Sequence, residues 1–273
     1  MFGFIQNKWL SYFKPDDYSK KNGQTVSDIE ELPADEKEKV LKMIKEERKK
    51  ELSNAPKIAI IGKTGVGKSS TINNLFNTNL GISHFESCTQ QAEPITISNG
   101  KGEIIIYDMP GLGEDLEKDE QHKREYKSIL PQCDVVLWIL NISDREMSSQ
   151  QQHIKEISEY LEGRLVVCAN KADILEPAEW IDSHNLPSVA QEENLKLRIA
   201  DIRKKLCKYI PNLVEDRIVF YSAKRKYRLN DLFVAMMEAC PDKRAWVLET
   251  RFDIADFKEL VNQEILIKLS NGK

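Results

Sequence analysis

Glycines, a lysine and a hydroxyl side chain recur near the start of the chain at a spacing that suits phosphate chemistry. Residues 62–69 read GKTGVGKS, which matches G-x-x-x-x-G-K-[ST], after an apolar β-branched run and before a helical pattern. Such glycines let backbone N–H groups wrap a polyphosphate at a helix N-terminus. We predict that Lys68 neutralises the β- and γ-phosphates and that the Ser69 hydroxyl coordinates Mg²⁺. The predicted phosphate-binding residues are Gly62, Lys63, Thr64, Gly65, Val66, Gly67, Lys68, Ser69 and Ser70.

A carboxylate ends a second apolar run. Residues 103–108 read EIIIYD, and Asp108 is followed by Met-Pro-Gly. A carboxylate at the C-terminal edge of a strand, beside a phosphate loop, holds Mg²⁺, often through water. Gly111 can offer its N–H to the γ-phosphate, and the loop after it moves when that phosphate leaves. We therefore predict Asp108 as a metal ligand and Gly111 as a sensor of the γ-phosphate.

Thr89 is the third candidate near the metal. It lies in FESCTQQ (85–91), between the first predicted helix and a hairpin. A threonine there coordinates Mg²⁺ through its hydroxyl and the γ-phosphate through its N–H. Thr71 and Thr78 compete for this role, but Thr71 lies inside the helix and Thr78 stands too close to its end. An ordinary surface threonine is the alternative reading.

Two further strand ends carry residues suited to reading a purine base. The strand RLVVCAN (164–170) runs into Asn170, Lys171, Ala172 and Asp173. The Asp173 carboxylate can accept hydrogen bonds from guanine N1–H and the exocyclic amine, whereas adenine offers no such donor pair. Lys171 can lay its aliphatic stem over the purine, and Asn170 braces the loop. The strand RIVFYS leads to the last predicted base-binding residues, Ser222, Ala223 and Lys224, where the Ala223 N–H can donate to guanine O6.

These segments together resemble a known family. GKTGVGKSS, CT, DMPGLGE, NKAD and SAK match the five G-motifs of the translation-factor-related GTPases, across residues 57–240. The chain is most similar to Era/TrmE-type bacterial GTPases, and CDVVLWILNISDREMSSQQQ (133–152) resembles their small stand-alone YfjP/YeeP-like members. GKTGVGKSSTIN also resembles a septin-like group that includes chloroplast import receptors. The resemblance implies a GTPase with GTP/GDP and Mg²⁺ as ligands.

The resemblance also implies slow unaided hydrolysis. Ras-like enzymes place a glutamine just after the DxxG glycine to orient water, and Leu112 occupies that position here. Glu114 lies six residues beyond Asp108, where Era/TrmE-type proteins carry a glutamate, and is our candidate for orienting water; a solvated loop acid is the alternative. Gln90 and Gln91 are weaker candidates. Arg145 could act as a finger or form a surface ion pair.

One departure concerns potassium. Potassium-activated members carry an asparagine in the phosphate loop where this chain has Gly65. The sequence therefore gives no support for potassium activation.

Alternating strand and helix patterns must position all of these residues. They predict an α/β fold of the P-loop NTPase type, a three-layer sandwich around a mainly parallel six-stranded sheet with one antiparallel edge strand. Asn99-Gly100 marks the one hairpin. The predicted strands are 57–62, 94–98, 103–108, 134–140, 164–170 and 217–222, and the predicted helices are 34–52, 69–77, 115–130, 148–162, 190–209, 229–239 and a tail over 244–269.

Composition limits the remaining possibilities. The chain has 273 residues, 41% hydrophobic and 31% charged, with a net charge of -4. This excludes wholesale disorder and disfavours a globally basic nucleic-acid binder. Its five scattered cysteines form no CxxC pair, so we expect a reduced protein without a disulfide framework or zinc site. With no apolar run of membrane-spanning length, we expect a cytoplasmic protein.

The ends differ from the centre. We predict a helical N-terminal extension (1–54), a GTPase domain (55–240) and an amphipathic C-terminal helix (241–273). Aromatic and aliphatic residues between Phe2 and Phe13 would line one face of a short helix. Packing on the chain's own C-terminal helix is the first interpretation; a membrane anchor, a partner contact and dimerisation are the others.

Three functional hypotheses follow. The first is a GTP-hydrolysing switch acting on a protein, RNA or ribosomal effector. The second is an assembly GTPase that forms nucleotide-dependent homodimers, at a membrane or away from one. The third is a GTP-binding module with negligible turnover. No KH-type GXXG segment follows the predicted domain, which disfavours a direct Era-like contact with RNA.

Overall fold

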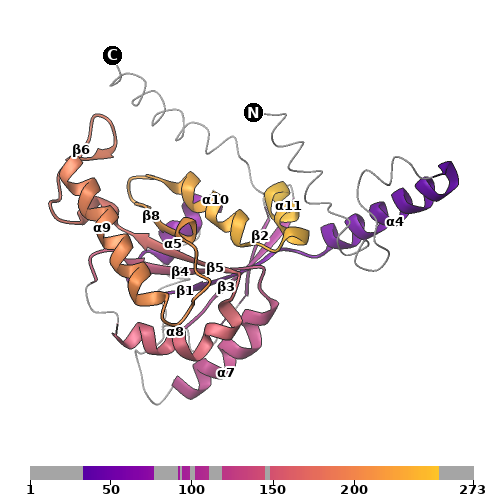
Figure 1. Cartoon of the computed structure of the whole chain (residues 1–273), viewed down its shortest axis with the longest axis horizontal. Helices are drawn as coiled ribbons and strands as arrows, with labels where there is room; N and C mark the ends of the chain where they lie inside the picture. Colours follow the sequence, from indigo (N-terminus) through magenta and orange to yellow (C-terminus); the bar gives the residue numbers. More distant parts are fainter. Residues whose placement is uncertain are drawn as a thin grey trace. The chain divides into compact units, whose positions relative to one another are not determined.

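Runs of β-branched and aliphatic residues form a six-stranded sheet in the computed structural model (Figure 1). The structure describes residues 33–76, 92, 94–98, 102–110, 119–144 and 148–251. The strand order is β2-β3-β1-β4-β5-β8, and only β2 runs antiparallel, paired with β3. The strands are β1 (Lys57–Ile61), β2 (Pro94–Ser98), β3 (Glu103–Asp108), β4 (Val135–Asn141), β5 (Leu165–Asn170) and β8 (Ile218–Phe220). The predicted mainly parallel sheet with an antiparallel edge strand is confirmed.

Helices cover both faces of this sheet, which completes the three layers (Figure 1). β4 and β5 are apolar along almost their whole length because both of their faces are covered. Residues such as Ala59, Val136 and Val167 pack against α7, α8 and α9. The helices are α4 (Ala34–Ser53), α5 (Lys68–Phe76), α7 (Asp119–Ile129), α8 (Ser148–Leu161), α9 (Val189–Leu206), α10 (Leu229–Ala239) and α11 (Asp242–Arg251).

The chain divides into two compact units. One unit contains α4, in a first segment that ends at Asn54, and Asp242–Val247 of α11. The other unit contains Ala55–Pro241 and the rest of α11. Within the first unit, the Arg244 guanidinium donates to the carbonyl oxygens of Glu51 (3.0 Å) and Asn54 (2.9 Å) and pairs with the Glu51 carboxylate. These bonds satisfy carbonyl groups that the end of α4 leaves without helical partners.

One local prediction was wrong, and one element was missed. The strand predicted over 217–222 is shorter, because Arg217 ends a 3₁₀ turn (Glu215–Arg217) and Ser222 leaves the ladder to bridge Tyr227. A small hairpin, β6 (Trp180–Ile181) and β7 (Leu186–Pro187), was not predicted at all. The Asn99-Gly100 turn, the N-terminal aromatic segment and the tail beyond Arg251 lie outside the described residues.

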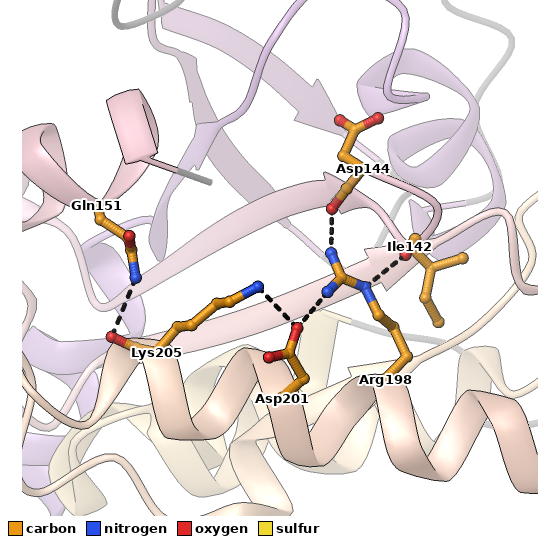
Figure 2. A network of polar contacts seen from close by, with 6 residues as sticks. All are labelled: Ile142, Asp144, Gln151, Arg198, Asp201 and Lys205. Atoms are coloured by element: carbon orange, nitrogen blue, oxygen red, sulfur yellow. Dashed lines mark hydrogen bonds and ion pairs between the residues drawn. The ribbon is translucent and has the colours of Figure 1, made fainter. Parts of the chain in front are cut away.

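A polar network attaches α9 to the segment after β4 (Figure 2). Arg198 is mostly buried, and its Nε donates to the Ile142 carbonyl oxygen at 2.9 Å. Its guanidinium also reaches the Asp144 carbonyl and the Asp201 carboxylate, which accepts from Lys205 Nζ at 2.8 Å as well. The hydrogen bond from Lys205, and then the charges of Lys205 and Arg198, hold the Asp201 pKa below its ordinary value. Because Ile142 N–H donates to the Asn170 carbonyl, this network supports the end of β5.

The lowered Asp201 pKa predicts a pH-dependent contribution to stability. The charged form is favoured in the folded state, so its contribution is complete above the unfolded-state pKa of 3.8 and is lost as pH falls below it. We expect Asp201→Asn to lower the free energy of unfolding at pH 7 by about 0.5–1 kcal/mol, since the side chain is 41% exposed. Urea unfolding at pH 7 and pH 3 would measure the difference, with exposed Asp216→Asn as control. A difference that stays constant or grows at low pH would contradict this assignment.

Candidate functional site

The predicted phosphate loop joins β1 to α5, as its sequence context requires. Gly65 and Gly67 have φ angles of +77° and +97°, a conformation that side chains with a Cβ rarely adopt. A Cβ on Gly67 would come within 2.4 Å of Asn170 Nδ2. The loop therefore needs glycine at this position both for its backbone conformation and for the close approach of β5.

Lys68 and Ser69 open α5 and are both nearly buried. Lys68 Nζ donates to the Gly62 carbonyl oxygen at 3.0 Å, so the side chain reaches back to the first residue of the loop. Val66 is buried, whereas Thr64 is exposed and Lys63 half-buried. The loop thus presents the Lys68 cation and the N-terminus of a helix, which together suit a polyphosphate.

Asp108 ends β3 next to β1, where the Met109 N–H donates to the Ile60 carbonyl. The carboxylate is 2% exposed, and neither of its oxygens has a hydrogen-bond partner among the described residues. Burial raises the Asp108 pKa to about 6, and the Lys68 charge opposes that rise. A buried carboxylate with free lone pairs and a serine hydroxyl in the first turn of α5 are oxygen donors that suit a hard cation such as Mg²⁺. Ser69 and Asp108 are therefore a suitable donor set.

The predicted base-reading residues meet at the ends of β5 and β8. The Asp173 Oδ1 accepts a hydrogen bond from Ser222 Oγ at 2.6 Å, and both side chains are buried. Asn170 Nδ2 donates to the Val66 carbonyl at 2.8 Å, and its Oδ1 accepts from the Ala223 N–H at 3.0 Å. Asn170 thus connects the phosphate loop to the loop of Ser222 and Ala223.

Lys171 and Lys224, two other predicted base-binding residues, are less buried than Asn170 and Asp173. Lys171 has a left-handed backbone (φ 65°) and precedes the 3₁₀ turn Ala172–Ile174 that carries Asp173. Lys224 is exposed. The Ala223 N–H already donates to Asn170 Oδ1. To donate to guanine O6, it must either share its hydrogen between the two acceptors or exchange one acceptor for the other.

Sequence reasoning missed one further link between the two halves of the site. Thr71 Oγ1 donates to the Gly67 carbonyl at 2.8 Å and lies 2.7 Å from the Tyr221 hydroxyl. Because threonine has a single hydroxyl proton, Tyr221 must be the donor to Thr71. Asn74 adds a second link by donating to the Ala223 carbonyl at 3.1 Å. Helix α5 is therefore hydrogen-bonded to the strand end that carries Ser222.

The predicted catalytic and metal residues Thr89, Gly111 and Glu114 lie outside the described residues, as do Gln90, Gln91, Leu112 and Arg145. Among the residues that are described, no helix is long and apolar enough to cross a bilayer.

Comparison with known proteins identifies the type of domain to which these elements belong. Residues 57–171 match the model of the family described as 50S ribosome-binding GTPase. The chain contains a P-loop GTPase domain. The matched segment of this GTPase domain runs from β1 to Lys171 and so includes the phosphate loop, Asp108 and Asn170.

Two curated relatives and two solved structures resemble the GTPase domain. YfjP, an uncharacterized protein of Escherichia coli (strain K12), is 30% identical over 53% of this chain and 50% of its own length. GTPase Era of Treponema denticola is 26% identical over 70% of this chain and 59% of its own length. The structure of Era with MgGDPNP and nucleotides 1506–1542 of 16S ribosomal RNA superposes with a TM-score of 0.52 and 25% identity, over 68% of this chain and 57% of that one. The bacterial dynamin GTPase LeoA (TM-score 0.55, 16% identity, 86% of this chain and 43% of that one) shares the fold alone.

Proposed function

We propose that this protein binds guanine nucleotides and hydrolyses GTP to GDP and phosphate as a molecular switch. The observation that carries the proposal is the buried Asp173 carboxylate, held by Ser222 beside an asparagine that bonds the phosphate loop. An ionised carboxylate only accepts hydrogen bonds, so it favours a base that presents two donors. Its position beside a triphosphate-type loop supports GTP and GDP as the ligands.

Mg²⁺ belongs to this proposal because the nucleotide's phosphates and the buried Asp108 both need a counter-charge. Ser69 would supply a hydroxyl ligand, Asp108 a carboxylate, directly or through water, and Thr89 a second hydroxyl. When bound, the ion would neutralise negative charge that develops on the phosphates. Lys68 would hold the β- and γ-phosphates from the other side of the loop.

The first experiment measures turnover. Phosphate release from GTP and from ATP would be followed under multiple-turnover conditions with Mg²⁺ and the full chain. We expect slow release from GTP, because Leu112 replaces the water-orienting glutamine of faster enzymes. We expect no release above background from ATP, because adenine lacks the two donors that Asp173 would accept from. Equal rates with the two nucleotides would contradict the proposed guanine specificity, and no release from GTP would leave only a binding function.

Glu114 is our proposed water-orienting residue, with Gly111 and Thr89 contacting the γ-phosphate. We expect Glu114→Ala to reduce kcat by about 100-fold, the lower end of the range for a positioned catalytic group, with GTP affinity unchanged. Single-turnover hydrolysis and nucleotide titration of the same preparation separate these two quantities. Glu193→Ala, an exposed acid of α9, is the control. Normal turnover in Glu114→Ala would eliminate this residue from the mechanism.

For the wider role, we propose a cytoplasmic switch whose effector is RNA or a ribosomal component. The support is the Era structure bound to 16S ribosomal RNA nucleotides, together with the family described as ribosome-binding. The G domain over 55–240 would carry the nucleotide, and the helical extensions over 1–54 and 241–273 would supply specificity. Pull-down of a GTP-locked full-length chain, compared with the GDP-bound chain, would identify the effector. Ribosomal RNA or proteins enriched only in the GTP state would support this role.

A further inference from the structure

The unpredicted segment between Glu179 and Gln191 contacts the backbone of the predicted base-reading Asp173 and the loop of Ser222, whose hydroxyl donates to the Asp173 carboxylate. It contains the β6–β7 hairpin, Ser188 and the first turn of α9 (Figure 1). We propose that this segment, which we call the 179–191 brace, is a positioning device for guanine specificity, with Gln191 and Asn185 as its two holding residues. The proposal rests on the proposed function, because it assumes that Asp173 reads the base.

Gln191 holds the backbone that carries Asp173. Its side chain is fully buried, and its Nε2 lies 2.9 Å from the Leu175 carbonyl oxygen, 3.2 Å from that of Ala172 and 3.4 Å from that of Asp173. The turn Ala172–Ile174 is a single 3₁₀ turn, in which the Leu175 N–H donates to the Ala172 carbonyl at 3.4 Å, so the Gln191 carboxamide adds donors that one short turn lacks. One carboxamide therefore fixes the turn on which the Asp173 carboxylate is mounted.

The start of α9 keeps Gln191 in this place. Ser188 is the N-cap, and its hydroxyl oxygen accepts from the Gln191 N–H at 3.2 Å. The Ser188 N–H donates to the Glu179 carbonyl at 2.8 Å, at the base of the hairpin. The hairpin and the helix cap thus form one hydrogen-bonded unit that leads directly to Gln191.

Asn185 acts on the Asp173 carboxylate indirectly, through the loop of Ser222 and Arg225. Its Nδ2 donates to the Arg225 carbonyl at 3.0 Å, while its Oδ1 accepts from the Trp180 indole at 3.2 Å. The Arg225 N–H donates to Ser222 Oγ at 3.1 Å, and Ser222 in turn donates to Asp173. Three hydrogen bonds, linked through the backbone of Arg225, therefore connect the hairpin to the carboxylate.

Aromatic and ionic contacts fix the geometry of the connection from Asn185 to Ser222. The Arg225 guanidinium stands over the Trp180 ring, 5.7 Å from its centroid, and pairs with Asp182 of the hairpin turn at 2.5 Å. Trp180 also meets Tyr227 edge to face at 5.1 Å between centroids, and Tyr227 bridges back to Ser222. The β6–β7 hairpin is too short to be stable alone. These contacts therefore stabilise both the hairpin and the loop that carries Ser222 and Arg225.

The test compares GDP with IDP, which lacks only the exocyclic amine of guanine. If Asp173 accepts from that amine, the wild-type chain binds GDP about 10-fold or more tightly than IDP, the value of one charge-assisted hydrogen bond. Gln191→Leu keeps the side chain's approximate size without its donors. Asn185→Gly removes the carboxamide yet suits the left-handed backbone there (φ 53°).

We expect both variants to lower the ratio of GDP to IDP affinity at least about threefold, measured by calorimetry with Mg²⁺. Ile157→Val, a buried change on α8, is the matched control: it destabilises the fold without touching the brace, so it leaves the ratio unchanged. If Gln191→Leu fails to fold, Asn185→Gly alone decides. A wild-type ratio in the folded variants would overturn the inference, whereas a wild-type chain that binds GDP and IDP equally would overturn the base-reading function beneath it.

Discussion

Lys68→Ala is expected to weaken binding of GTP with Mg²⁺ by about 10- to 100-fold, the cost of one or two charge-assisted hydrogen bonds to phosphate. The reason is the position of the Lys68 ammonium in the phosphate loop. The Lys68 ammonium is buried at the start of α5 and is now satisfied by the Gly62 carbonyl oxygen, 3.0 Å away across the phosphate loop. Other phosphate contacts come from backbone N–H groups, which the substitution does not remove.

The measurement for Lys68→Ala is a titration with a non-hydrolysable GTP analogue, with urea unfolding of the same preparation to confirm the fold. Lys155→Ala, which removes an exposed lysine of α8, is the matched control and should bind as wild type. GDP binding should fall less than that of the GTP analogue, because the lysine also faces the γ-phosphate. Unchanged affinity for the triphosphate analogue would show that residues 62–69 are not the phosphate loop.

Asp173→Asn is expected to change base preference from guanosine to xanthosine nucleotides. In the wild-type chain Ser222 occupies one lone pair of Oδ1, which leaves acceptor positions on both carboxylate oxygens. The asparagine variant presents an N–H₂ group in place of one oxygen. That group opposes the guanine amine but can donate to the C2 carbonyl of xanthine. We expect GDP affinity to fall on the order of 100-fold or more and XDP affinity to rise.

Competition titrations with GDP, XDP and ADP would test this prediction. Asp216→Asn, at an exposed position outside the site, is the control for a lost carboxylate. The variant should stay folded because asparagine Oδ1 can still accept from the Ser222 hydroxyl. Full GDP affinity in Asp173→Asn would mean that another group reads the base.

The sequence predicted the sheet and the described site residues at its edge because their signals are local. Strands such as β4 are almost continuous apolar runs, and the G-x-x-x-x-G-K-[ST] spacing is specific to a phosphate loop, where Gly67 adopts a φ angle that other residues rarely do. In parallel strands the C-terminal ends meet at one edge, so Asp108, Asn170 and the phosphate loop had to be neighbours once the topology was known.

The brace could not be predicted because its signals are neither periodic nor local. β6 and β7 have two residues each, too few to show alternation. Gln191 is a polar residue on the buried side of α9, and only its three carbonyl partners explain its place. The sequence placed Tyr221 in a strand but gave no sign of its hydrogen-bond partner. Its hydroxyl bonds to Thr71, 150 residues away in the sequence, and so joins the two halves of the site.

The central claim is selective binding of guanine nucleotides, and one calorimetric comparison tests it most directly. The full chain with Mg²⁺ would be titrated with GDP and, separately, with ADP. The account predicts saturable binding of GDP and affinity for ADP at least about 100-fold lower, because adenine would leave the buried Asp173 carboxylate without its donors. Equal affinities, or tighter binding of ADP, would contradict it.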